Sequence, residues 1–209
     1  MRIINGLLYQ VDGKQYPFVP TPNMGGRLTP RFLVMHFTAG VSAGSAIHWM
    51  SNPEAKAAAH IVIGRDGAIT QMVPFEQVAW HAGKSSWQGL DNLNRHSIGI
   101  ELDNPGRLVP SGEAWVSDPK NPKHKYSSSE VLVATHKHET APSGWYKYPE
   151  VQLRAAQELA ALLARTYALQ DILGHEDIAP GRKADPGPAF PMDRFRATVM
   201  AMARLPLAG

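Results

Sequence analysis

The feature that most constrains the fold is a continuous apolar run, RFLVMHFT, at residues 31–38. An unbroken apolar run of this kind is expected of a strand that is buried on both faces. A second short strand, SIGIELDN, is predicted at 97–104, and a hairpin is predicted at 59–74, where Asp66-Gly67 forms the tight turn. Buried strands that alternate with helices indicate an α/β fold with a mixed sheet.

The helices and the last strand are predicted from periodicity and from residues that start or stop helices. Helices are expected at 42–50, at 150–168 after Pro149, and at 192–204. A brief strand is expected at 171–175. The sequence therefore predicts a central mixed β-sheet flanked by helices.

The length of 209 residues fits a single domain, and no Gly/Ser-rich or Pro-rich linker divides the chain. Residues 1–30, which include PFVPTPNMGG, are predicted to be an irregular arm packed on the domain. Residues 31–209 are expected to form that domain. The region 103–149 is the least regular, with a polar loop, DPKNPKHKYSSS, and one strand in EVLVATH.

Composition excludes several classes of protein. A hydrophobic share of 44% and a charged share of 19% are typical of a globular protein. A net charge of +3 favours an anionic partner, but without a Lys/Arg block we expect no nucleic-acid binding. The chain has no cysteine, so any metal must be bound by histidine and carboxylate side chains.

No apolar run approaches the length of a transmembrane helix, and the first residues lack the apolar core of a secretory signal. A cytoplasmic protein is therefore expected, with export by a phage or other non-classical route as the alternative. We expect a monomer, although nothing in the sequence tests this.

A stretch rich in glycine and proline, GHEDIAPGRKADPGPAF at 174–190, contains candidate metal ligands. His36 and His175 lie at the ends of predicted strands, where α/β proteins place ligands and catalytic groups. Asp185 follows across a loop that its prolines make stiff. Two imidazoles and one carboxylate are a ligand set for zinc that leaves a fourth position open.

Two further residues have the chemistry that an activated water needs. Glu101, within the apolar run IGIEL, is a candidate general base, since a carboxylate among apolar neighbours is costly to bury. The alternative is a carboxylate at a sheet edge. Lys183 brings a positive charge close to Asp185, and its alternative role is that of a solvated loop lysine.

Four stretches together resemble the zinc-dependent N-acetylmuramoyl-L-alanine amidases, a family that shares its fold with the peptidoglycan recognition proteins. The resemblance extends from about residue 31 to 195 and is strongest to the branch that includes the anhydro-muropeptide amidases. The stretches that carry it are VMHFTAG (34–40), AHIVIGRDGAITQMVPFEQVAWHAG (59–83), SIGIEL (97–102) and GHEDIAPGRKADPGPAF (174–190).

The resemblance implies a role for each residue that matches the family pattern. His36, His175 and Asp185 are implied to be the zinc ligands. Glu101 is implied to be the catalytic acid and base, and Lys183 to stabilise the tetrahedral intermediate.

The resemblance also implies a substrate groove lined by His81, Arg65 and Asn92. A hydrogen-bonded structural role is the alternative for His81. Further aromatic residues are candidates either for stacking on sugars or for packing the loops, namely Trp87, Trp115, Trp145 and Tyr146. His136 and His138 face the same side if they lie on a strand, so a second metal site there is a further hypothesis.

The function implied by the resemblance is zinc-dependent hydrolysis of the amide between N-acetylmuramic acid, including its 1,6-anhydro form, and L-alanine. The expected partner is peptidoglycan or a soluble muropeptide. Two alternatives remain open: a peptidoglycan-binding module without activity, and the same chemistry in a phage or secreted lysin.

Overall fold

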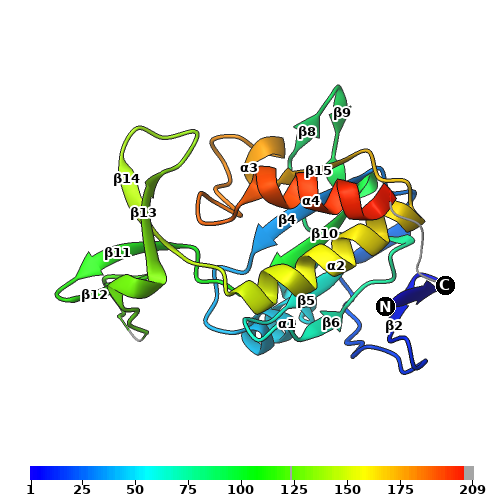
Figure 1. Cartoon of the computed structure of the whole chain (residues 1–209), viewed down its shortest axis with the longest axis horizontal. Helices are drawn as coiled ribbons and strands as arrows, with labels where there is room; N and C mark the ends of the chain where they lie inside the picture. Colours follow the sequence, from blue (N-terminus) through cyan, green and yellow to red (C-terminus); the bar gives the residue numbers. More distant parts are fainter. Residues whose placement is uncertain (123, 205–209) are drawn as a thin grey trace.

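The computed structural model describes residues 1–122 and 124–204, and a five-stranded sheet lies at its centre (Figure 1). Its strand order is β15-β4-β10-β5-β6. The first four strands are parallel and β6 is antiparallel to β5, which confirms the predicted mixed α/β sheet. The strands are β4 (Phe32–Phe37), β5 (Ile61–Ile63), β6 (Ile69–Gln71), β10 (Ser97–Leu102) and β15 (Asp171–Gly174).

Helices α2 (Glu150–Thr166) and α4 (Met192–Arg204) cover one face of this sheet (Figure 1). Side chains alternate between the two faces of a strand, so every second apolar residue of β4 and β10 points toward these helices. Each fully buried aliphatic side chain there contributes about 1.5–3 kcal/mol to folding. The cluster includes Leu33, Met35, Ile98, Ile100, Leu102, Leu159 and Leu163.

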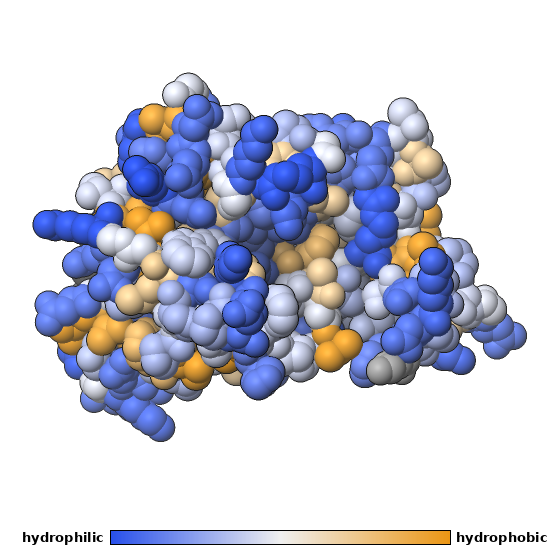
Figure 2. Space-filling view, turned by 180° about the vertical axis from the view of Figure 1, so that it is seen from behind, coloured by the Kyte–Doolittle hydropathy of each residue, from blue (hydrophilic) through white to orange (hydrophobic). Residues whose placement is uncertain are grey.

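The opposite face receives the remaining residues of the same strands. Helix α1 (Ala43–Met50) lies toward this side, and the Ser42 hydroxyl caps it by accepting the Ser45 N–H. By alternation, His36 of β4 and Glu101 of β10 belong to this face. Seen from behind, the surface is hollowed near its centre, where hydrophilic and hydrophobic residues meet (Figure 2).

Short strands surround the central sheet, and several lie where the sequence predicted an irregular arm. Leu8 of the arm is fully buried in the main core, and its N–H donates to Gln71 Oε1 at 2.9 Å. Segments 2–4 and 7–9 pair with each other as a local hairpin, whereas segment 24–27 pairs with the distant segment 77–79. They are β1 (Arg2–Ile4), β2 (Leu7–Tyr9), β3 (Met24–Arg27), β7 (Gln77–Ala79), β8 (Ser86–Trp87) and β9 (Leu90–Asp91).

A second sheet, here called the side sheet, projects from one end of the molecule (Figure 1). It is antiparallel with strand order β12-β11-β14-β13, and it forms within the 103–149 region, where the sequence predicted only the strand that is now β13. Lys123, in the predicted polar loop, and 205–209, at the end of the predicted domain, lie outside the described residues. The strands are β11 (Arg107–Ser111), β12 (Ala114–Val116), β13 (Val131–Thr135) and β14 (Pro142–Tyr146).

Three 3₁₀ turns complete the described elements: η1 (Pro53–Ala55), η2 (Leu93–Arg95) and η3 (Ser128–Glu130). Among the helices of residues 1–122 and 124–204, none has the combined length and apolar character needed to cross a membrane.

The packing of α2 on the sheet gives a test of the fold. Leu159 is fully buried in the main core. Leu159→Ala should lower the free energy of unfolding by about 2–5 kcal/mol, because it removes buried methyl groups and leaves a cavity. Glu158→Ala, at an exposed position of the same helix, should change it by less than about 0.5 kcal/mol. Urea unfolding followed by circular dichroism measures both values, and equal effects of the two variants would contradict this packing.

Candidate active site

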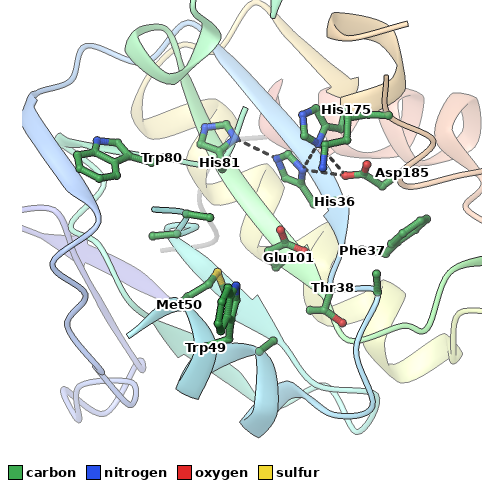
Figure 3. Close-up of a pocket in the computed structure, with 15 residues that line it drawn as sticks. His36, Phe37, Thr38, Trp49, Met50, Trp80, His81, Glu101, His175 and Asp185 are labelled. Atoms are coloured by element: carbon green, nitrogen blue, oxygen red, sulfur yellow. Dashed lines mark hydrogen bonds and ion pairs between the residues drawn. The ribbon is translucent and has the colours of Figure 1, made fainter. Parts of the chain in front are cut away.

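Two neighbouring strands place His36 and Glu101 side by side. Strands β4 and β10 are parallel, and their register pairs Glu101 with His36 near the carboxyl ends of both strands. In α/β proteins, ligands bind at the carboxyl ends of the parallel strands. Figure 3 shows both side chains among the residues that line one pocket.

His175 comes from β15, the other neighbour of β4. Gly174 is the last residue of β15 and pairs with Met35, and His175 then begins the short helix α3 (His175–Ile178). The sequence predicted a loop here rather than a helix. The Asp177 carboxylate caps this turn by accepting the Gly174 N–H at 2.6 Å, which holds the start of α3 against the end of the strand.

The loop after α3 returns Asp185 to His175. The Glu176 N–H donates to the Asp185 carbonyl at 2.9 Å, and the Lys183 N–H donates to the Ala179 carbonyl at 3.0 Å. These backbone hydrogen bonds hold a proline-rich segment in a defined path without regular secondary structure.

The side chains of His36, His175 and Asp185 converge on one another. Asp185 Oδ2 lies 2.9 Å from His36 Nδ1 and 3.0 Å from His175 Nδ1, and the two nitrogens are 2.9 Å apart. All three residues are buried, with exposed fractions of 1, 3 and 6%. Ligand atoms of a tetrahedral zinc site are typically about 3.3 Å apart. The arrangement is therefore compact enough for one metal ion.

The hydrogen bonds of His175 place a hydrogen on its outer nitrogen, Nε2. His175 Nε2 lies 3.0 Å from the Ala82 carbonyl, which can only accept. Arg182 Nη2 is also near, at 3.3 Å, but its two hydrogens are directed at the carbonyls of Ala82 and Lys84, at 2.7 and 2.6 Å. His175 Nε2 must therefore be a donor, and Nδ1 is the nitrogen that faces the Asp185 carboxylate.

His36 is uncharged near neutral pH. Burial, and then the neighbouring His175, lower the pKa of His36 to about 4, although Asp185 opposes this shift. Lone pairs and a carboxylate that face one another repel unless a cation lies between them. A neutral imidazole pair with one carboxylate is a donor set that suits zinc and similar divalent ions. Across the described ranges, these three residues are the group that could hold a metal ion.

Glu101 has the properties of a proton-transfer group. Its Oε2 is shielded from solvent and has no hydrogen-bond partner among the described residues. Burial raises the pKa of Glu101 to about 8, the Asp185 charge adds to the increase, and Lys183 opposes it. A carboxyl group whose pKa lies near neutrality can both accept and return a proton.

These residues share a pocket of about 280 Å³ whose walls are both polar and apolar (Figure 3). Lys183 lies at its exposed side. Trp49 of α1 and Trp80 flank the opening, and they are 56% and 39% exposed. The sequence did not single out either tryptophan, although Trp80 directly precedes His81 in the quoted motif. Exposed aromatic rings at a pocket rim are suited to the apolar faces of sugars or peptides.

The three residues predicted to bind substrate lie in different places. His81 lines the pocket. The Arg65 guanidinium forms an ion pair with Asp103 at 3.3 Å and lies 5.1 Å from the centre of the Tyr146 ring, outside the pocket. Asn92 precedes η2 with a positive φ of 57° and is also outside the pocket.

The other aromatic candidates, Trp87, Trp115, Trp145 and Tyr146, do not line this pocket. Trp145 is almost fully buried in the side sheet, and its Nε1 donates to the Ala134 carbonyl at 3.0 Å. Packing is the role that these positions favour.

His136 and His138 fasten the side sheet to α3. His136 Nε2 lies 2.6 Å from the Glu176 carboxylate, and His138 Nε2 lies 3.1 Å from the Glu176 carbonyl. His136 Nδ1 accepts the His138 N–H at 3.2 Å. These contacts occupy three of the four ring nitrogens of the pair, and within the described residues the pair belongs to no metal-binding group.

Known proteins are similar to this chain in sequence and in fold. A family model described as N-acetylmuramoyl-L-alanine amidase matches residues 26–188. The 1,6-anhydro-N-acetylmuramyl-L-alanine amidase AmpD of Citrobacter freundii is 32% identical over 163 residues, which cover 78% of this chain and 68% of that protein. AmpD of Escherichia coli is 30% identical over 201 residues, which cover 87% and 90%.

Among solved structures, the fold is similar to a complex of the N-acetylmuramyl-L-alanine amidase AmiD from E. coli with the substrate anhydro-N-acetylmuramic acid-L-Ala-D-gamma-Glu-L-Lys. The TM-score is 0.60 at 26% identity, and the match covers 93% of this chain and 66% of that one.

The converging ligands give a direct test of metal binding. Zinc should raise the melting temperature of the metal-free protein, because an ion at 100 times its Kd stabilises the folded state by about 2.7 kcal/mol. Asp185→Ala should abolish most of this increase. Glu113→Ala, which removes an exposed carboxylate in the side sheet, should retain it. A wild-type melting temperature that does not respond to zinc would contradict the metal site.

Proposed function

The chain belongs to the N-acetylmuramoyl-L-alanine amidase family, and from this premise we propose that it is a zinc enzyme that cleaves anhydro-muropeptides. The bond cut is the amide between the lactyl group of the muramic acid and L-alanine. The similarity to AmpD and to the AmiD–substrate complex supports this substrate class. The observation that carries the proposal is the convergence of three ligand atoms next to the unpaired Glu101 carboxyl group.

His36, His175 and Asp185 would hold the zinc ion, which fits them because two imidazoles and one carboxylate already face a common point. When bound, zinc supplies Lewis acidity to the amide carbonyl and to a water molecule. The remaining steps depend on amino-acid side chains of the protein.

Glu101 transfers the proton. Its carboxylate takes a proton from the attacking water as the new C–O bond forms, and the protonated group then donates to the amide nitrogen as the C–N bond breaks. The products are the free lactyl carboxylate and the peptide with a free amino group. The position of Glu101 next to His36 in the register of β4 and β10 keeps it within the same pocket as the ligands.

Lys183 stabilises the negative charge that develops on the carbonyl oxygen. Its ammonium group belongs to the pocket lining, where its charge lowers the pKa of Glu101. A positive charge at the developing oxyanion stabilises the transition state more than the neutral ground state. Trp49 and Trp80 lie at the rim, where the substrate enters. Arg65 and Asn92 lie outside the pocket and take no part in this proposal.

The role of Glu101 predicts that its substitution lowers turnover but leaves metal binding unchanged. Glu101→Gln keeps the shape of the side chain but cannot accept a proton, so kcat should fall by about 10²–10⁴-fold. Zinc content, measured by atomic absorption, should stay at one ion per chain. A Glu101→Gln enzyme with wild-type kcat would remove Glu101 from the mechanism.

The form of the substrate is tested by product analysis. We expect soluble anhydro-muropeptide to be split into the anhydro-sugar and the free peptide, as read by mass spectrometry, and chelator treatment to stop the reaction. Purified sacculi run in parallel test the lysin alternative, and faster release from sacculi would favour it. Binding of either substrate without cleavage would favour a recognition module.

A further inference from the structure

A buried series of hydrogen bonds connects the backbone of β10 to the candidate ligand His36. His81 Nε2 lies 3.2 Å from the Ser97 carbonyl and 3.3 Å from the Ser97 hydroxyl. His81 Nδ1 lies 3.0 Å from His36 Nε2. Figure 3 shows the His81–His36 contact continuing to His175 and Asp185. Both nitrogens of His81 are therefore used inside the protein.

The hydrogen bond between His81 and the Ser97 carbonyl determines the direction of the next one, between His81 and His36. The Ser97 carbonyl can only accept, and the hydrogen of the Ser97 hydroxyl is directed at the Leu93 carbonyl at 2.6 Å. His81 Nε2 must therefore be the donor. Among the described residues, no carboxylate contacts His81 to support a second proton on the buried ring. His81 Nδ1 thus accepts, and His36 Nε2 is the donor to it.

The consequence for His36 is that its single proton resides on Nε2. Its Nδ1, the atom that faces His175 and Asp185 at 2.9 Å, is left with a lone pair. Only the deprotonated nitrogen of an imidazole can bind a metal ion.

The surroundings of His81 hold its ring in this position. Asn94 Oδ1 accepts the N–H groups of both His81 and Ala82, at 2.9 and 2.6 Å. Gly99 of β10 lies directly beneath the ring, and a Cβ atom at that position would lie 2.4 Å from His81 Cγ. The strand that carries Glu101 therefore has room for the ring only because residue 99 is glycine.

We propose that His81 is a positioning residue that selects the His36 tautomer with a free Nδ1 and so prepares the metal site. The inference rests on the proposed zinc site and assigns His81 to the support of a ligand rather than to substrate binding. Groups that hydrogen-bond to metal-ligating histidines orient the ring and raise its basicity, and their loss typically costs about 10–100-fold in metal affinity.

His60 provides a matched control. It is buried like His81, and the centres of the two rings are 5.8 Å apart. Its Nε2 donates to the Gln77 carbonyl at 2.9 Å and its Nδ1 accepts the Gly99 N–H at 3.0 Å. His60 thus has the same kind of hydrogen bonds as His81 but forms none with His36.

The test compares zinc affinity across a small set of variants, measured by competition with a chromophoric chelator. His81→Phe removes the acceptor and should weaken zinc binding about 10–100-fold. His81→Asn places an amide oxygen close to the position of Nδ1, so it should restore affinity to within a few-fold of the wild type. His60→Asn should leave affinity unchanged. Equal affinities for wild type and folded His81→Phe would overturn the inference.

A second measurement does not depend on the variants. In the metal-free wild-type protein, ¹H–¹⁵N correlation of the imidazole nitrogens should show His36 as the Nε2–H tautomer. A spectrum with the His36 proton on Nδ1 would overturn the inference even if His81→Phe did not fold. Absence of zinc binding by the wild type would instead contradict the proposed function itself.

Discussion

The in-register parallel pairing of β4 with β10 is the constraint on which the rest of the structure depends. It aligns His36 with Glu101 on one face, while Leu33, Met35 and Ile100 point to the other face, under α2 and α4. Because side chains alternate with a period of two, a slip of one residue would exchange these sets. The candidate ligand and the candidate base would then face the apolar core. The same hydrophobic pattern that drives folding therefore also positions the candidate ligand and the candidate base.

Electrostatics explains why the candidate site suits a cation. The Asp185 carboxylate and the Nδ1 atoms of His36 and His175 lie within 3.0 Å of one another, in surroundings that exclude most water, and neutral rings with lone pairs on Nδ1 would repel the carboxylate. Buried charges and lone pairs are costly unless they are paired. The hydrogen bonds of the outer nitrogens, to Ala82 and to His81, prevent the rings from relieving this repulsion by changing tautomer. A divalent ion would turn the repulsion into attraction, so the protein offers a preorganised site.

The side sheet supports the site although it contributes no residue to the pocket. Glu176 directly follows His175 in α3, and its buried carboxylate is paired with His136 at 2.6 Å and with Lys137 at 2.9 Å. These contacts connect the turn after β13 to the helix that begins at a candidate ligand. A region that the sequence indicated to be mainly loop thus restrains one wall of the metal site.

The central strands, the two long helices and the candidate catalytic and metal-binding residues could all be predicted from local features of the sequence. Apolar runs such as 31–38 and helical periodicity at 150–168 are local signals, and the spacing around His175 and Asp185 lies within one short stretch. Only the tertiary structure decided which of the proposed groove residues reach the pocket: His81 does, whereas Arg65 and Asn92 do not. It also revealed the side sheet, in which Arg107 of β11 pairs with Trp145 of β14, and the contact between His81 and His36, which lie 45 residues apart. The physical reason is that hydrogen-bond partners, burial and tautomers depend on neighbours in space, which local periodicity does not specify.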